Sequence, residues 1–159
     1  MQQNLIRLSL AALALVSVNA FAQNLPYGAP ISLEAAKKVT QAAVAEMHKK
    51  RLELTIAVVD SGGNLVYLER ANQAPIGTVD AAIGKAKAAN GIKAPTKAIE
   101  EQILNGNKLN LLAVPGAFPV EGGVLLVANN QIIGAIGASG AMPADDGVVA
   151  NAGAKSLQP

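Results

Sequence analysis

Two β-prone segments joined by a short polar turn occupy residues 54–70 and constrain the fold more than any other stretch of the chain. Residues 55–59 are almost continuously apolar, whereas residues 65–70 alternate apolar and polar side chains. Residues 60–64 read Asp-Ser-Gly-Gly-Asn, which is typical of a tight turn. An unbroken apolar strand indicates cover on both faces. We therefore predict a β-hairpin whose first strand is central and whose second strand lies nearer an edge.

The remaining elements follow from apolar spacing, capping residues and turn residues. The sequence does not alternate strands and helices in the way that a parallel sheet requires. It predicts an α/β (α+β) fold, a five-stranded antiparallel sheet with helices packed on it. The predicted helices are residues 32–50, 77–90, 96–105 and 143–155, and the further strands are residues 109–114, 124–128 and 131–138.

The first 22 residues have the pattern of a secretory signal peptide. Met1–Arg7 contains a basic residue, Leu8–Val18 is apolar, and Ala20-Phe21-Ala22 is a small-x-small cleavage site. A membrane anchor is the alternative, but a spanning helix needs about 20 apolar residues. We expect a mature single domain, residues 23–159, in the periplasm or secreted.

Composition narrows the classes of partner. The chain has 13 Lys and Arg against 11 Asp and Glu, and the basic residues are scattered. This distribution favours neither nucleic acid nor, once the signal peptide is removed, a membrane. The absence of cysteine excludes a disulfide framework. The abundance of alanine and glycine, with the Pro-containing apolar loop at residues 113–120, predicts a homo-oligomer.

The chain offers little for catalysis by its own side chains. Gly134, Gly137 and Gly140 recur every three residues but lack the spacing of a nucleotide-binding loop, so close packing or a bulge explains them better. Ser139 would need a glycine in place of Ala141 to form a nucleophile elbow. We assign no catalytic residue, and the sequence favours a binding protein over an enzyme.

His48 is the one histidine of the chain, near the end of the first predicted helix. A metal site built from protein side chains alone is disfavoured because zinc sites need three or four ligands. A helix-end histidine favoured by the helix dipole is one interpretation. The other is an axial ligand to haem iron, because a single histidine can hold haem in an apolar pocket.

Four stretches together resemble the GlcG/HbpS-like haem-binding family over nearly the whole mature chain. They are residues 56–63 with Arg70, residues 84–89, residues 122–124, and residues 134–140 with Asp146 and residues 152–153. The resemblance implies a profilin-like or PAS-like fold that forms oligomers, often octamers. The family includes PduO C-terminal-like domains. Some members bind haem or iron outside the cytoplasm, and other members sit beside glycolate or propanediol utilisation genes.

Arg70 and Lys85 match the family pattern, so the resemblance suggests that they bond haem propionates or another carboxylate. Alternatively, they form structural pairs with Glu69 or Asp80. His48 is proposed as the iron ligand because it is unique, not because a motif places it. We expect Asp146 to cap the closing helix.

Three functions remain open from the sequence. The first is an exported haem-binding oligomer that scavenges or senses haem. The second is a small-carboxylate-binding accessory or sensory protein linked to glycolate or diol utilisation. The third is an enzyme acting on haem or a small metabolite, for which no general base can be assembled from the sequence.

Overall fold

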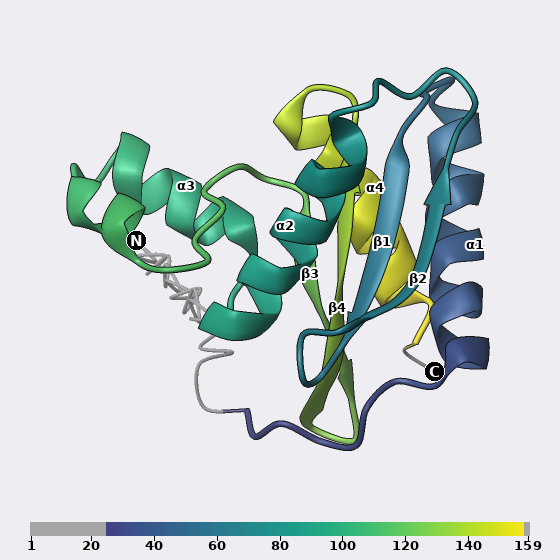
Figure 1. The fold of residues 1–159 in the computed structure, drawn as a ribbon, viewed down its shortest axis with the longest axis horizontal. Coiled ribbons are helices and arrows are strands. Elements are labelled where there is room, and N and C mark those ends of the chain that lie inside the picture. Colours follow the sequence, from purple (N-terminus) through teal and green to yellow (C-terminus); the bar gives the residue numbers. More distant parts are fainter. Residues whose placement is uncertain (1–24, 158–159) are drawn as a thin grey trace, which may run out of the picture.

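A computed structural model describes residues 25–157, so the predicted signal peptide lies outside the described residues. The described chain forms one antiparallel sheet with helices on both faces (Figure 1). Its elements, in order, are α1 (Leu33–Lys49), β1 (Thr55–Asp60), β2 (Leu65–Arg70), α2 (Thr78–Ile92), α3 (Thr96–Leu104), the 3-10 helix η2 (Leu109–Ala113), β3 (Gly123–Ala128), β4 (Gln131–Ser139) and α4 (Pro143–Lys155).

The sheet has the strand order β2-β1-β4-β3, and every neighbouring pair is antiparallel. The predicted hairpin is confirmed: β1 is an inner strand, buried from Thr55 to Val59, and β2 is an edge strand. The β3–β4 hairpin turns at Asn129 and Asn130, which both have positive φ, at 49° and 58°. Asparagine tolerates this left-handed region, and two such residues make the turn that suits twisted strands.

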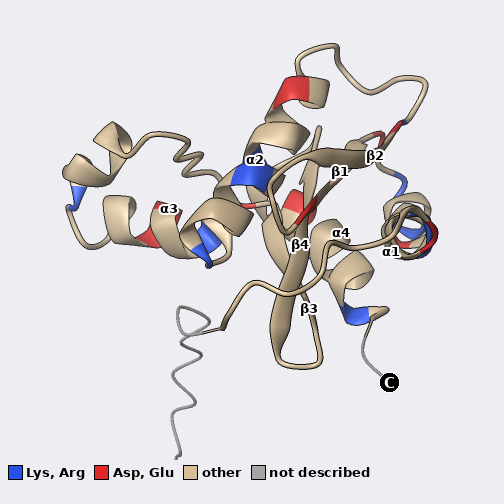
Figure 2. Cartoon of the chain, turned by 60° about the horizontal axis from the view of Figure 1, so that its bottom comes forward, with Lys and Arg blue, Asp and Glu red and all other residues tan. Residues whose placement is uncertain are grey.

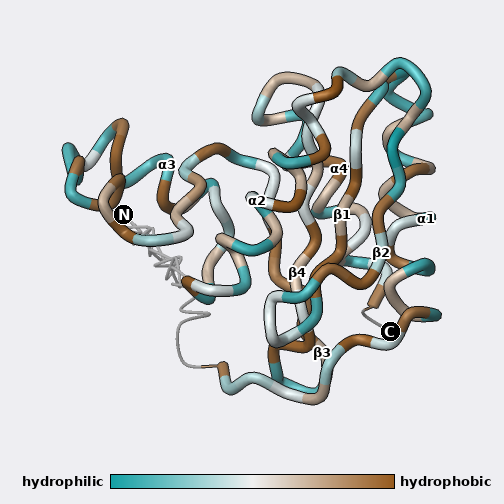
Figure 3. Tube along the Cα trace, viewed as in Figure 1, coloured by the Kyte–Doolittle hydropathy of each residue, from teal (hydrophilic) through white to brown (hydrophobic). Residues whose placement is uncertain are grey.

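Helix α2 covers one face of the sheet, and α1 and α4 cover the other (Figures 1 and 3). The larger apolar core lies on the α1 and α4 side, around Ile56, Val58 and Ile136. On the α2 side, small residues such as Ala86 and Ala135 pack directly together. Both faces of β1 are therefore shielded, which explains its continuous apolar sequence.

Gly137 shows why alanine and glycine dominate the α2 side. A Cβ atom added at Gly137 would overlap the carbonyl oxygen of Ala82 and lie 2.7 Å from the amide nitrogen of Ala86, both on α2. The helix backbone thus rests against the strand backbone. The prediction that glycine in this strand reflects close packing is confirmed.

The prediction of a fifth strand at residues 109–114 is wrong, because Leu109–Ala113 is a 3-10 helix and the described sheet has four strands. Its backbone bonds are local, from the Leu111 amide to the Lys108 carbonyl and from the Val114 amide to the Leu111 carbonyl. The segment lies on an excursion, residues 93–121, that projects from the sheet, and Leu112 is 59% exposed. We call residues 93–121 the α3 arm. A profilin-like or PAS-like arrangement remains a prediction.

Residues 26–31, which precede α1, lie alongside the first residues of β4, beyond the point where β1 stops pairing with β4. Tyr27 forms an isolated parallel bridge with Ile132, and the Gly28 amide donates to the Ile132 carbonyl at 2.8 Å. Lys93 fixes this segment from the end of α2, donating to the Leu25 carbonyl at 2.9 Å with its ammonium 4.4 Å from the Tyr27 ring centroid.

Charged residues are spread over both helical layers and the α3 arm (Figure 2). Within residues 25–157, no helix is long and apolar enough to cross a membrane.

Candidate functional site

A cavity of about 400 Å³ opens between the C-terminal end of α1 and the open end of the β1–β2 hairpin, where β1 starts and β2 ends. Its size lies within the range of small-molecule sites. The lining combines apolar side chains with a histidine, an arginine and two carboxylates. The lining residues are Val44, Met47, His48, Glu53, Leu54, Ile56, Glu69, Arg70, Ala71, Asn72 and Gln73.

Local structure explains why His48 and Arg70 meet here. Helix α1 ends where Arg51 adopts a φ of 57°, and the Leu52 amide turns back to bond the Met47 carbonyl at 3.0 Å. The chain then enters β1, and hairpin pairing places Thr55 opposite Arg70. The last turn of α1 and the end of β2 therefore share one end of the molecule.

The floor of the cavity is apolar. Met47, Leu54 and Ile56 are each at most 3% exposed and belong to the larger core. The Met47 sulfur accepts a hydrogen bond from the Leu54 amide at 3.4 Å, so this thioether is engaged within the chain. The imidazole of His48 lies at the exposed rim, and no hydrogen bond within the described residues engages it. A ligand entering the cavity meets an apolar floor with an available imidazole beside it.

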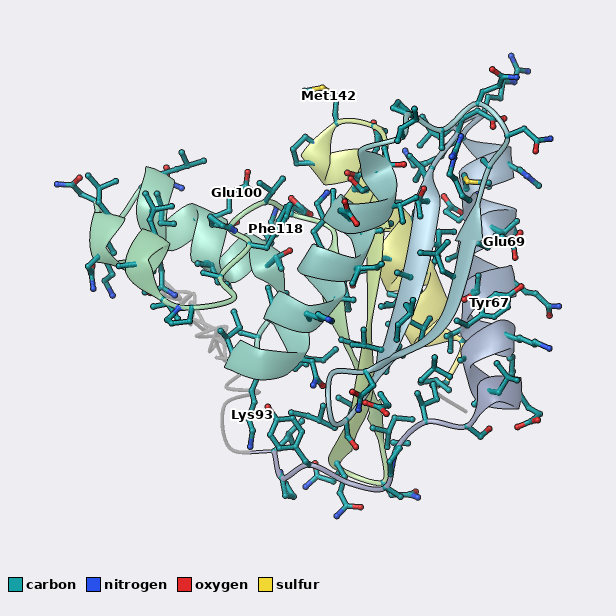
Figure 4. The ribbon with its side chains drawn as sticks, in the orientation of Figure 1. Tyr67, Glu69, Lys93, Glu100, Phe118 and Met142 are labelled. Atoms are coloured by element: carbon teal, nitrogen blue, oxygen red, sulfur yellow. The ribbon has the colours of Figure 1, made fainter. Side chains whose placement is uncertain are left out.

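Two carboxylates are held at the same cavity by neighbouring donors. The Tyr67 hydroxyl donates to Glu69 Oε2 at 3.3 Å, and the backbone amide of Gln73 donates to Glu53 Oε2 at 3.2 Å. Figure 4 shows Tyr67 and Glu69 extending from β2 on the side where α1 lies. Partial burial and the Glu69 carboxylate raise the pKa of Tyr67, so its hydroxyl remains a donor at neutral pH.

Lys85 lies elsewhere, in a buried ion pair that joins the two helical layers. Its ammonium, on α2, is 2.7 Å from Asp146 Oδ2, on α4, and donates to the Ala138 carbonyl at 3.2 Å. The side chains are 3% and 2% exposed. Burial raises the pKa of Asp146, against the opposing effects of Lys85 and the Ala141 amide. Lys85 is thus paired across the sheet, with neither Glu69 nor Asp80.

Gly122 makes room for this ion pair at the start of β3. A Cβ atom there would lie 3.0 Å from both Lys85 Cδ and Asp146 Cβ, and the φ of 133° favours glycine. Asp146 does not cap α4 as predicted. Met142 occupies the N-cap position, and Asp146 Oδ1 instead accepts from the Ala141 amide at 3.0 Å.

Of the three candidate residues, the structure brings His48 and Arg70 to one cavity and places Lys85 outside it. Sequence reasoning missed Glu53 as a lining residue and considered Glu69 only as a partner for Arg70. The hairpin register, which pairs Ile56 with Glu69, could have located Glu69. Within residues 25–157, no group of three or more His, Cys, Asp or Glu could hold a metal ion by itself.

Comparison with known proteins places this chain among related sequences and folds. A family model described as haem degrading protein HbpS-like matches residues 31–155. The GlcG protein of Escherichia coli K12 is 37% identical over 110 residues, covering 69% of this chain and 81% of that protein.

Two solved structures share the fold. A double mutant of Streptomyces reticuli HbpS is 31% identical, with a TM-score of 0.75 over 85% of this chain and 92% of its own. Klebsiella pneumoniae ORFY is 26% identical, with a TM-score of 0.76 over 82% of this chain and 92% of its own. The chain therefore belongs to the HbpS-like family.

Proposed function

We propose that this protein binds haem in the cavity lined by His48 and Arg70. The observation that carries the proposal is that the one histidine of the chain and an exposed arginine line the same cavity over an apolar floor. A porphyrin needs an apolar surface for its ring, a ligand for its iron and a cation for its carboxylates. These three requirements are met by different residues of one cavity.

The histidine, the arginine and the apolar lining residues have distinct roles in this proposal. The His48 imidazole would hold the iron, because the Met47 sulfur already accepts a hydrogen bond from the Leu54 amide. The Arg70 guanidinium bonds a propionate, for which its planar array of donors is suited. Val44 and Ile56, which line the cavity, would supply apolar surface for the ring. Haem supplies a redox-active iron when it is bound.

The family supports haem as the ligand, since the matching model is described as haem degrading protein HbpS-like. We propose binding for scavenging or sensing, without turnover by this chain. If ascorbate destroys bound haem no faster than free haem, turnover is excluded under those conditions. Faster destruction of the bound haem would support an enzyme instead.

We further propose that residues 1–22 direct export, so that the mature domain works in the periplasm or outside the cell as a homo-oligomer, with an octamer as one possible assembly. Apolar side chains exposed on the α3 arm support assembly: Leu104 is 73% and Leu109 58% exposed. A soluble monomer rarely leaves a contiguous apolar surface uncovered.

Haemin titration of the purified mature protein tests the binding proposal. The native protein should give a saturable Soret band that His48→Ala abolishes or shifts, and Arg70→Ala should weaken binding. Arg51→Ala is the matched control, because Arg51 lies beside the cavity without lining it. A titration that resembles that of a non-binding control protein would refute the proposal.

A small-carboxylate ligand is the second candidate, and the exposed Arg70 at the cavity is the observation in its favour. A thermal-shift series with glycolate and related acids tests it. Stabilisation that Arg70→Ala removes would support this candidate, and no stabilisation by any acid would eliminate it.

A further inference from the structure

The acidic residues of the cavity have no role in the haem-binding proposal as stated above. Glu53 and Glu69 line the same cavity as Arg70, and each accepts a hydrogen bond that holds its carboxylate there, from the Gln73 amide and the Tyr67 hydroxyl. A carboxylate fixed at a binding cavity repels other carboxylates that approach it.

Few positive charges oppose this repulsion from within the cavity. Arg70 is the one cation among the lining residues. In the last turn of α1 and at its C-cap, Lys49 is 3.4 Å from Glu46, and Lys50 is 2.7 Å from Asp145. Arg51 is not part of the lining. The C-terminal end of α1, which carries the negative end of the helix dipole, also faces this region.

We propose that Glu53 and Glu69 make the cavity selective among porphyrins according to their carboxylate number. This inference rests on the proposed haem site. Arg70 pairs with one propionate. Each further carboxylate on the porphyrin is repelled by Glu53 and Glu69, so a porphyrin with fewer carboxylates is repelled less. Protohaem, with two propionates, is therefore preferred over the more acidic coprohaem, with four. Negative charges that disfavour the wrong ligand are a common source of specificity.

Parallel titrations with protohaemin and coprohaemin test the inference in the mature protein. The measured quantity is the dissociation constant of coprohaemin divided by that of protohaemin, so a larger ratio means a stronger preference for protohaemin. The native protein should favour protohaemin, and Glu53→Gln and Glu69→Gln should each reduce that preference by roughly two- to fivefold, as for partly exposed charge interactions. Added salt should also reduce it.

Glu101→Gln is the matched control, because Glu101 is an exposed acid on the α3 arm, away from the cavity. It should leave the ratio unchanged. Tyr67→Phe removes the donor that holds Glu69 and should lower the ratio with a smaller effect than Glu69→Gln. This graded response distinguishes a charge at the site from a general loss of stability.

The outcomes separate the two proposals. Saturable binding of both haemins with equal affinity, unchanged in Glu53→Gln and Glu69→Gln, would overturn the selectivity inference and leave haem binding intact. Binding of neither haemin would refute the haem site itself. A native preference that falls in both cavity variants and persists in Glu101→Gln is the result that the inference predicts.

Discussion

The ammonium of Lys85 and the carboxylate of Asp146 face each other in the interior at 2.7 Å. Removing two charges from water is costly, and their attraction offsets this cost only while both are present. The Ala138 carbonyl and the Ala141 amide supply further hydrogen bonds to the pair. The chain therefore depends on Lys85 and Asp146 as a unit that ties α2 to α4.

Replacing Lys85 by methionine should lower the free energy of unfolding by about 3–5 kcal/mol, because the Asp146 carboxylate would be buried without its cation. Lys85→Met combined with Asp146→Leu should recover most of this loss. Urea unfolding measures both changes. Lys87→Met, at an exposed position of the same helix, is the control. A single Lys85→Met variant as stable as the native protein would contradict this account.

The pH dependence of that variant follows from the pKa of Asp146, which burial raises above its ordinary value of 3.8. A carboxyl whose pKa is raised by folding contributes stability at low pH that is lost as pH rises through the folded-state pKa. Lys85 lowers the pKa of Asp146 against the effect of burial. In Lys85→Met this pKa should therefore lie higher still, so that the carboxyl stays protonated, and adds to stability, up to a higher pH. The stability deficit of Lys85→Met should therefore be smaller at about pH 5 than at about pH 7.5.

Urea unfolding of the native and variant proteins at both pH values measures this difference. The double variant with Asp146→Leu, which lacks the carboxyl, should show no such change. A deficit of Lys85→Met that is constant with pH would show that Asp146 does not control it.

At the scale of elements, the contact between α2 and β4 leaves no space for a side chain at Gly137. Gly137→Ala should lower the free energy of unfolding by about 1–3 kcal/mol or more, because the added methyl group meets the backbone of α2, which cannot rotate away. Gly91→Ala is the contrasting variant, since no atom lies within 4 Å of its added Cβ.

Near the C-terminal end of α2, Gly91→Ala should be neutral or should stabilise the protein by up to about 0.5–1 kcal/mol, the gain expected within a helix. Thermal and urea unfolding compare the two variants. Equal effects of both substitutions would mean that helix α2 does not approach the sheet as closely as described.

Elements set by local signals were predictable from the sequence. Ser32 caps α1, accepting from the Ala35 amide at 3.2 Å, and the asparagine turn joins β3 to β4. The strand predicted at residues 109–114 failed because an apolar run indicates burial without saying where it packs. Here the run lies on the α3 arm, where Leu109 is 58% exposed, and local hydrogen bonds replace sheet pairing.

The candidate site was predictable only in part. Uniqueness singled out His48 and a family resemblance singled out Arg70, but the hairpin register was needed to place both at one cavity. The pairing of Lys85 with Asp146 crosses the sheet between residues far apart in the sequence. No local pattern encodes such a contact, because it depends on how two helices pack on opposite faces.

At the scale of the whole molecule, the α3 arm exposes several large apolar side chains, among them Leu104, Leu109 and Leu112, and clustered apolar exposure is typical of an interface. Light scattering on the mature protein should therefore report a mass that is a multiple of the single chain. Replacing Leu104 and Leu112 by serine should shift the protein towards smaller species without unfolding it, since both side chains are exposed. A native protein that is a uniform monomer would contradict the assembly proposal.

The central claim is that haem iron binds His48 in the cavity between α1 and the β1–β2 hairpin. Anomalous diffraction at the iron edge, from crystals of the haemin-treated mature protein, measures the position of the iron directly. We predict a peak at bonding distance from a His48 imidazole nitrogen, with the porphyrin over the apolar floor. An iron peak at any other site, or none despite haemin in solution, would contradict the account.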